Sequence, residues 1–280
     1  MSRSRAFFQV DVFSSVPCMG NPVGVVLDAD GLSDQEMQRF AHWTGLPETT
    51  FVLGPTEPDA DYRLRIFTPH TELPFAGHPT LGSAHAWLEN GGAPQVERQI
   101  VQQCQVGLVR VLRGPTGLSF AAPPTVRTGP IDEPELVQIA AALKIGRDLI
   151  IDHQWVDNGP GWAVVQLSSA QQVLDLNPDL TVLPDGMIGA IGAYPEGCDP
   201  RYEIRTFAPR IGVPEDPACG SMNASVAQWL TTGETLARSY RVSQGAALGR
   251  AGILEIALDS NRAVWVGGAT NTLINGTVKL

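Results

Sequence analysis

The sequence predicts an α+β protein made of two similar halves, and three observations lead to this prediction. An Arg-x-Phe-x-Pro run occurs twice, at 65–69 and 205–209, so that the copies lie 140 positions apart in a chain of 280 residues. A glycine that begins a predicted helix follows each run, Gly77 in the first half and Gly220 in the second. Short runs rich in Val, Ile, Phe and Tyr outnumber helical segments, which indicates strands. A repeat this long indicates two fused half-domains.

Two further matches in the same order support the duplication. Val101-Gln102-Gln103 recurs more loosely as Val242-Ser243-Gln244, at an offset of 141. Gly20-Asn21-Pro22 is echoed by Asn158-Gly159-Pro160-Gly161, and the two asparagines are 137 positions apart. Because several matches share nearly one offset, chance is a poor explanation.

The Pro- and Gly-rich stretch 114–130 follows the end of the first copy and predicts the junction between the halves. We expect the first half to comprise residues 1–117 together with about 265–280, and the second half to comprise 118–264. The final segment, 264–280, is strand-like and could by itself return to either half.

Predicted strands are recognised by apolar residues that alternate or cluster in short runs. They cover 7–13, 23–27, 62–67, 106–112, 163–167, 202–207 and 253–258. Between the second and third of these, Ser33 begins a helix that extends to about Trp43, because Glu36 completes a capping box.

Three more helices are expected. Apolar residues at helical spacing predict buried central helices at 79–88 and 221–230. Gly91-Gly92 and Gly233 are expected to end them. A further helix is predicted at 133–143, where Pro134 lies near the start.

Composition and charge exclude several classes of protein. A net charge of −10 argues against nucleic acid as a partner, because phosphate binding depends on basic patches. No apolar run reaches the roughly 20 residues that cross a bilayer, so no membrane association is expected. The basic start passes directly into an alternating strand pattern, which is unlike a signal peptide. The four cysteines show neither metal-type spacing nor disulfide density, so we expect a cytoplasmic protein without a metal.

The two glycine-led helix starts are candidate anion sites. A helix N-terminus presents unsatisfied N–H groups and a partial positive charge, and glycine allows a ligand to approach closely. Gly77 and Gly220 therefore suit a substrate carboxylate, and Ser221 adds a hydroxyl donor. Either glycine alone is more commonly an ordinary capping residue; the repetition favours a site.

Three ionisable residues are candidates for proton transfer. His78 lies in the first turn of its helix, where the local positive potential favours a neutral imidazole. Asp216 precedes Gly220 and could pair with a histidine or serve as a cap. Glu48 follows Leu46-Pro47 beside an apolar run and could be a general acid or base, although surface glutamates are far commoner.

At these residues the chain resembles the PhzF-like isomerase family of phenazine biosynthesis. The resemblance runs from end to end, and its most specific segment is Pro74-Phe75-Ala76-Gly77-His78-Pro79-Thr80. Four other segments also match: 10–13 with 20–25, Pro47 to Phe51, Glu215 to Ser221, and Val266-Gly267-Gly268.

The resemblance implies a diaminopimelate-epimerase-like fold, in which two pseudo-symmetric halves each wrap strands around a central helix and enclose the active site between them. It also implies a cofactor-independent enzyme, usually a homodimer. The catalytic glutamate of the family falls on Glu48, its histidine on His78 and its aspartate on Asp216. Main-chain groups at Gly77, Gly220 and Ser221 would hold the substrate carboxylate. Asn21 is a further candidate for the wall of the site.

Cys219 departs from the family pattern, which has threonine there. Related amino-acid epimerases carry one catalytic cysteine at this point and another at the matching point of the first half, where this chain has Ala76. A two-cysteine racemase is therefore incomplete. Cys219 could be an accessory group at a helix N-terminus or a small buried residue.

Three functions remain open from sequence. The first is an isomerase of specialised metabolism that moves a proton by acid/base catalysis on a small unsaturated or amino-substituted carboxylic acid. The second is a PhzF-like C–C bond hydrolase of the kind linked to alkylproline pathways. The third is a non-catalytic binding protein that retains the fold; the presence of Glu48, His78 and Asp216 argues against it.

Overall fold

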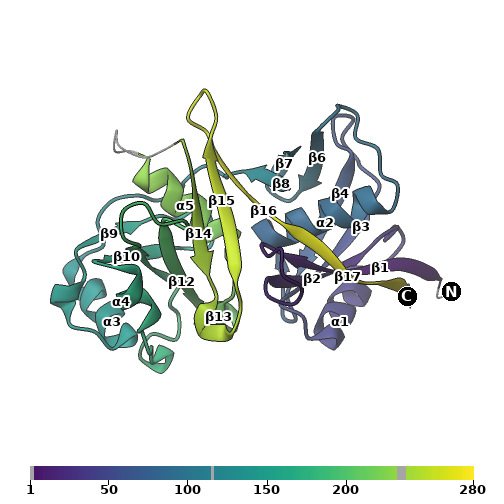
Figure 1. The fold of residues 1–280 in the computed structure, drawn as a ribbon. Helices are drawn as coiled ribbons and strands as arrows, with labels where there is room; N and C mark the ends of the chain where they lie inside the picture. The colour runs from purple at the N-terminus through teal and green to yellow at the C-terminus, as the bar shows by residue number, and fades with distance from the viewer. Residues whose placement is uncertain (1–2, 115–116, 232–237) are drawn as a thin grey trace. The chain divides into compact units, whose positions relative to one another are not determined.

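The computed structural model describes residues 3–114, 117–231 and 238–280. These residues form many short strands and a few helices, which confirms the α+β prediction (Figure 1). The chain folds into two compact units. Unit 1 comprises Met1–Ala121 and Gly267–Leu280, and unit 2 comprises Ala122–Val266. Strand β16 (Val264–Gly268) crosses the boundary between them.

Unit 1 holds two helices and nine strands among the described residues. In chain order they are β1 (Ser4–Val12), β2 (Asn21–Val26), α1 (Asp34–Thr44), β3 (Glu48–Leu53), β4 (Tyr62–Phe67), β5 (Glu72–Leu73), α2 (Gly77–Glu89), β6 (Gln99–Cys104), β7 (Gly107–Arg113), β8 (Leu118–Ala121) and β17 (Thr270–Lys279).

Unit 2 repeats this plan with additional helices. Its elements are α3 (Glu133–Leu143), β9 (Asp152–Trp155), β10 (Ala163–Leu167), α4 (Ala170–Leu174), β11 (Ile188–Ala193), β12 (Tyr202–Ala208), β13 (Val213–Asp216), α5 (Gly220–Leu230), β14 (Ser239–Gln244) and β15 (Gly252–Leu258).

The strand pairings of the two units follow the same alternation. In unit 1, β1–β2, β3–β4 and β6–β7 are antiparallel, whereas β2–β3 and β4–β6 are parallel. In unit 2, β9–β10, β11–β12 and β14–β15 are antiparallel, whereas β10–β11 and β12–β14 are parallel. The sequence repeat therefore corresponds to a repeat of topology.

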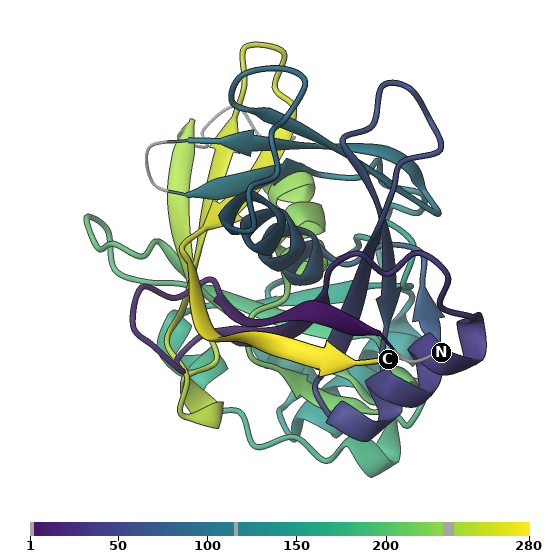
Figure 2. The same cartoon turned by 90° about the vertical axis from the view of Figure 1, so that its right-hand side faces the viewer.

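Each unit is built around one buried helix. Helix α2 lies against β1, β2, β3 and β8, and Figure 2 shows it among the strands of its unit. Packing there is close: a Cβ added at Gly82 would lie 2.3 Å from Val23 Cγ1. In unit 2, α5 buries Met222, whose side chain packs directly over Gly189 of β11. Glycine at these two positions lets helix and strand approach.

The predicted helices are present, with small shifts at their starts. Ser33 caps α1 and makes both hydrogen bonds of a capping box with Glu36. Helix α3 has the predicted bounds. The central helices begin at Gly77 and Gly220, slightly earlier than the periodic pattern indicates, because the glycines carry no apolar side chain. Helix α2 ends at Glu89 just before Gly91-Gly92, whereas the predicted stop at Gly233 lies outside the described residues.

The end of the chain returns to the first half. Strand β17 pairs antiparallel with β1, and Arg3 and Leu280 exchange two main-chain hydrogen bonds (Figure 1). Strand β17 thus completes the sheet that begins with β1. In the described residues, no helix combines the length and the apolar character needed to cross a bilayer.

The arginines of the two Arg-x-Phe-x-Pro runs make matching ion pairs. Arg65 donates two hydrogen bonds to the carboxylate of Glu72, from Nε at 2.8 Å and from one terminal nitrogen at 2.7 Å. Arg205 donates to Glu215 in the same way, with both distances 2.8 Å. The side chains of the second pair are only 5% and 10% exposed, against 21% for each partner of the first. Each half therefore uses the arginine of this motif in an ion pair with a glutamate of the same unit.

Candidate active site

Glu48 and His78 form a buried acid/base pair in unit 1. The carboxylate oxygen Glu48 Oε2 lies 3.0 Å from His78 Nε2. Glu48 is 8% exposed and His78 is 4% exposed. Glu48 begins β3 directly after the loop that follows α1, and His78 is the second residue of α2. Two groups that can exchange a proton are thus held together away from bulk water.

Asn21 contacts the other side of the imidazole. Its amide nitrogen Nδ2 lies 3.2 Å from His78 Nδ1. Because an amide NH2 group can only donate, Nδ1 is the acceptor, and the hydrogen of a neutral imidazole resides on Nε2. This Nε2 atom is the one that lies 3.0 Å from Glu48 Oε2. Asn21, which the sequence analysis predicts to line the site, thus lies beside His78.

Local structure explains why these three residues meet. Helix α1 ends at Gly45, which adopts a left-handed conformation with φ of 64°, so the chain can turn sharply into β3. In β3, Thr50 Oγ1 lies 2.8 Å from Ser83 Oγ of α2, which ties the Glu48 strand to the His78 helix. Parallel pairing of β2 with β3 places Val23 opposite Glu48, two residues from Asn21.

A buried glutamine fixes the start of α2. Gln102 Nε2 donates to Thr80 Oγ1 at 3.0 Å, and the hydroxyl of Tyr62 donates to Gln102 Oε1 at 3.1 Å. Burial raises the pKa of Tyr62 well above its usual range, so its hydroxyl stays protonated and keeps donating. The N-cap residue of α2, Ala76, makes no side-chain capping hydrogen bond.

The second helix start, in unit 2, is organised by a different glutamine. Gln244 Oε1 accepts from the main-chain N–H of Cys219 at 3.1 Å and from Asn223 Nδ2 at 3.0 Å. Gln244 Nε2 donates to the main-chain oxygen of Asp216 at 2.8 Å. The same side chain thus fixes the segment before α5 and its first turn. Gly220 is buried there, and Ser221 is half-buried.

Asp216 and Cys219 take positions that sequence alone left open. Asp216 ends β13, is half-buried, and accepts from the main-chain N–H of Ala218 at 3.0 Å. The Asp216 carboxylate therefore helps to fix the turn that leads into α5. Cys219 occupies the N-cap position of that helix, and its side chain makes no capping hydrogen bond. Cys219 is 5% exposed.

Two residues that the sequence analysis did not assign to the site, Asn158 and Trp162, contact Ser221. Trp162 Nε1 lies 2.6 Å from Ser221 Oγ. Ser221 Oγ lies 3.3 Å from Asn158 Oδ1, and Asn158 Nδ2 donates to the main-chain oxygen of Ser221 at 3.1 Å. The available signal was the repeat itself, since Asn158 is the counterpart of Asn21.

The structure therefore brings the predicted residues together in two groups. Glu48, His78, Asn21 and Gly77 lie in unit 1, and the second group lies in unit 2. The members of that second group are Asp216, Cys219, Gly220 and Ser221. Across the described ranges, no cluster of three His, Cys, Asp or Glu side chains is arranged to hold a metal ion.

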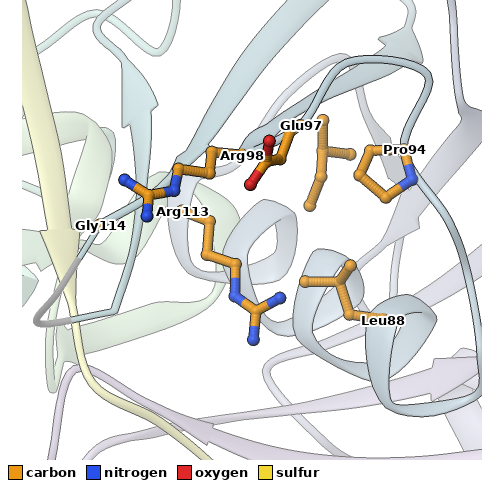
Figure 3. A pocket seen from close by; sticks show the side chains of 7 residues that line it. Leu88, Pro94, Glu97, Arg98, Arg113 and Gly114 are labelled. Carbon is orange, nitrogen blue, oxygen red and sulfur yellow. The ribbon is translucent and has the colours of Figure 1, made fainter.

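A surface cavity of about 750 Å³ lies elsewhere in unit 1. Figure 3 shows the side chains that line it, among them Arg98, Arg113 and Glu97. It also contacts Leu88, near the end of α2, which is ten residues and therefore about 15 Å of helix from His78. None of the predicted site residues lines this cavity, so its size does not identify it as the active site.

Comparison with known proteins gives a consistent result. The family model for phenazine biosynthesis-like proteins (PhzC-PhzF) matches residues 10–276. Antisense-enhancing sequence 1 of Schizosaccharomyces pombe is 40% identical, over 97% of this chain and 98% of that protein. Trans-2,3-dihydro-3-hydroxyanthranilate isomerase of Pseudomonas chlororaphis is 34% identical, with the same two coverages of 97% and 98%.

Solved structures share the fold. A PhzF family protein of Enterococcus faecalis superposes with a TM-score of 0.82 over 99% of this chain and 100% of that one, at 24% identity. A hydroxyproline epimerase of Agrobacterium vitis superposes with a TM-score of 0.63 over 99% and 93%, at 13% identity. The two-half, diaminopimelate-epimerase-like fold expected from sequence is thereby confirmed.

Proposed function

The chain belongs to the PhzC-PhzF family of phenazine biosynthesis-like proteins and is an isomerase, and we propose that it moves a proton between two carbons of a small unsaturated or amino-substituted carboxylic acid without a cofactor. The observation that carries the proposal is the buried contact of 3.0 Å between Glu48 Oε2 and His78 Nε2. A shielded carboxylate beside an imidazole suits general acid/base catalysis. The isomerases among the relatives support a role in specialised metabolism.

The proposed reaction begins when the Glu48 carboxylate removes a proton from a saturated carbon of the substrate. The electron pair left behind is delocalised through the conjugated system toward the substrate carboxylate. The Glu48 carboxylic acid then returns the proton to a different carbon, so the double bond shifts and the composition is unchanged. His78 donates its Nε2 hydrogen toward Glu48 and, with Asp216, polarises the substrate.

The helix starts would supply the charge stabilisation that this step requires. Main-chain N–H groups at Gly77, Gly220 and Ser221 would hold the substrate carboxylate, where negative charge accumulates in the transition state. The N-cap residue of neither α2 nor α5 makes a side-chain capping hydrogen bond, which supports this role.

A proton-exchange experiment tests the proposal. The wild-type protein and the Glu48→Gln variant would be incubated in D2O with trans-2,3-dihydro-3-hydroxyanthranilate and other conjugated cyclic acids, and the products analysed by NMR and mass spectrometry. We expect deuterium in an isomer of unchanged skeleton, and a loss of rate of about 10²- to 10⁴-fold in the variant. Glu97→Gln, which alters an exposed carboxylate of the same unit, is the matched control and should retain full activity.

The other outcomes separate the alternatives. A smaller product together with a released acid fragment would identify a C–C bond hydrolase. Exchange that persists in Glu48→Gln would remove Glu48 from the mechanism. Absence of turnover with every acid, accompanied by unaltered ligand binding in the variant, would favour a non-catalytic binding protein.

We also propose a homodimer in the cytoplasm that does not bind nucleic acid. The four cysteines form no disulfide bond with one another, which suits a reducing compartment, and the net charge of −10 disfavours contact with phosphates. The dimer rests on the family resemblance. Light scattering coupled to gel filtration would test it, since a mass of 30.0 kDa would indicate a monomer.

A further inference from the structure

The surface cavity of unit 1 combines two positive charges with an apolar wall. Leu88, Pro94 and Ile100 supply apolar surface, and Arg98 and Arg113 supply the charges. In Figure 3 both guanidinium groups lie to the left of Leu88 and Pro94, so charged and apolar groups occupy different sides. The volume of about 750 Å³ lies within the range of about 300–1,000 Å³ that is typical of small-molecule sites.

The two arginines of the cavity are not neutralised by the rest of the protein. In the part of the chain that the structure describes, the side chains of Arg98 and Arg113 make neither a hydrogen bond nor an ion pair. Arg65 and Arg205, by contrast, are each paired with a glutamate. Carboxylates are plentiful, since the chain has 29 acidic residues against 19 Lys and Arg. The donors of Arg98 and Arg113 are therefore available to a ligand.

The main chain holds these arginines next to each other. The N–H of Arg113 donates to the main-chain oxygen of Arg98 at 2.9 Å. The next residue, Gln99, lies opposite Leu112 where β6 pairs with β7, and its N–H closes a turn by donating to the oxygen of Val96 at 3.1 Å. Arg98 and Arg113 therefore flank the end of one strand pair.

A single carboxylate anchors both sides of the turn that carries Arg98. Asp61 Oδ1 accepts from the N–H of Gln95 at 2.8 Å, and Asp61 Oδ2 accepts from the N–H of Val101 at 2.7 Å. The side chain of Gln95 also donates to the main-chain oxygens of Pro58 and Ala60, at 3.1 and 3.0 Å. This wall of the cavity is thus formed before a ligand arrives, which lowers the entropic cost of binding.

From these observations we infer that the cavity binds a small organic anion with two separate acidic groups on an apolar body. The planar guanidinium groups of Arg98 and Arg113 each match an acidic group in a bidentate manner, and the body covers Leu88 and Ile100. Glu97 also lines the cavity, and its carboxylate weakens the binding of such a ligand by like-charge repulsion. The inference goes beyond the proposed function, because none of the candidate active-site residues lines this cavity.

A binding experiment with three probes tests the inference without requiring turnover. Isophthalate carries two carboxylates on a ring, and benzoate carries one. Glutarate places its two carboxylates the same number of carbons apart but has no ring. By calorimetry, the wild-type protein should bind isophthalate about 3- to 10-fold more tightly than benzoate, because the second carboxylate gains a guanidinium partner. Isophthalate should also bind more tightly than glutarate, because only its ring covers the apolar wall.

Variants of the lining residues locate the bound probe. Arg98→Gln and Arg113→Gln should each abolish the preference for isophthalate over benzoate. Glu97→Gln should raise the affinity for isophthalate by about 2- to 5-fold, since it removes a like charge; a merely structural defect would not raise affinity. Arg39→Gln, at an exposed arginine of α1 that does not line this cavity, is the matched control and should leave all three affinities unchanged.

An isophthalate affinity of the wild-type protein no higher than that of benzoate or of glutarate, including failure to bind, would overturn the inference. So would a preference that survives in both arginine variants, because isophthalate would then bind elsewhere. These results are separate from the deuterium experiment. A protein that binds isophthalate through Arg98 and Arg113 but exchanges no proton would keep the cavity assignment and lose the proposed reaction.

Discussion

The duplicated ion pair allows a more buried and a less buried copy of the same Arg–Glu contact to be compared. Arg205 and Arg65 occupy equivalent positions and each grips a glutamate through two parallel hydrogen bonds. The two ion pairs differ in how deeply their side chains are buried. The Arg205–Glu215 side chains are 5% and 10% exposed, whereas those of Arg65 and Glu72 are both 21% exposed. We expect Glu215→Gln and Glu72→Gln to have different costs for this reason.

The expected magnitudes follow from what each arginine retains. In Glu215→Gln, the buried guanidinium of Arg205 loses its ion pair and keeps its hydrogen bonds to the main-chain oxygens of Val173 and Leu176. Breaking a buried pair in this way costs about 3–5 kcal/mol. In Glu72→Gln, Arg65 is more solvated and keeps its ion pair with Asp34, so the cost is about 1 kcal/mol.

Calorimetric and urea unfolding of the two variants measures the difference. For domains of this size the larger cost corresponds to a lowering of the melting temperature by about 6–20 °C. Replacing both partners, with Arg205→Met and Glu215→Leu, should recover most of the loss because neither charge of this pair then remains buried. Equal losses of stability in the two single variants would refute the argument that burial determines the cost.

Two other predictions concern packing and pH. Gly82→Ala should destabilise the protein by about 1–3 kcal/mol despite the better helix propensity of alanine, because the added Cβ would lie 2.3 Å from Val23 Cγ1. Gly276→Ala, where nothing lies within 4 Å of the added Cβ, should be nearly neutral. Similar midpoints of urea unfolding for the two variants would contradict this prediction. Burial raises the pKa of Glu203, so the folded protein holds a proton that the unfolded chain releases, and stability falls as pH rises from the ordinary glutamate pKa to the raised one. The melting temperature of Glu203→Gln should therefore gain on that of wild type as pH rises above the ordinary glutamate pKa of about 4.3, and a difference that stays constant with pH would exclude the titration of Glu203 as its cause.

Much of the fold could be predicted because its determinants are local. The capping box at Ser33, the proline near the start of α3 and the alternating strand patterns each act over a few residues. Helix α4 was missed because five residues are too short to show a helical period. The return of β17 to unit 1 could not be decided from the strand pattern either, since it depends on pairing with β1 at the far end of the chain.

The candidate site likewise combines residues that the sequence predicts with contacts that only the folded structure creates. Glu48 and His78 could be proposed from family motifs, and the structure adds the 3.0 Å contact between them, which no spacing along the chain predicts. Trp162 escaped prediction because its contact with Ser221 joins residues 59 positions apart. Ser221 could be proposed from its place at a helix start, but its hydrogen bonds to Trp162 and Asn158 depend on the tertiary fold.

The pairing of the first strand with the last has a consequence for how the protein is made. Unit 2 is continuous in the chain and precedes the final strand, so its residues leave the ribosome before β17 is synthesised. Unit 1 is interrupted by all of unit 2, and its β1 edge stays uncovered until Thr270–Lys279 emerges. Because domains fold as units during synthesis, unit 1 should finish folding after unit 2, although its first residues are translated earlier. Glu48 and His78 should therefore reach their final arrangement only after β17 has been synthesised.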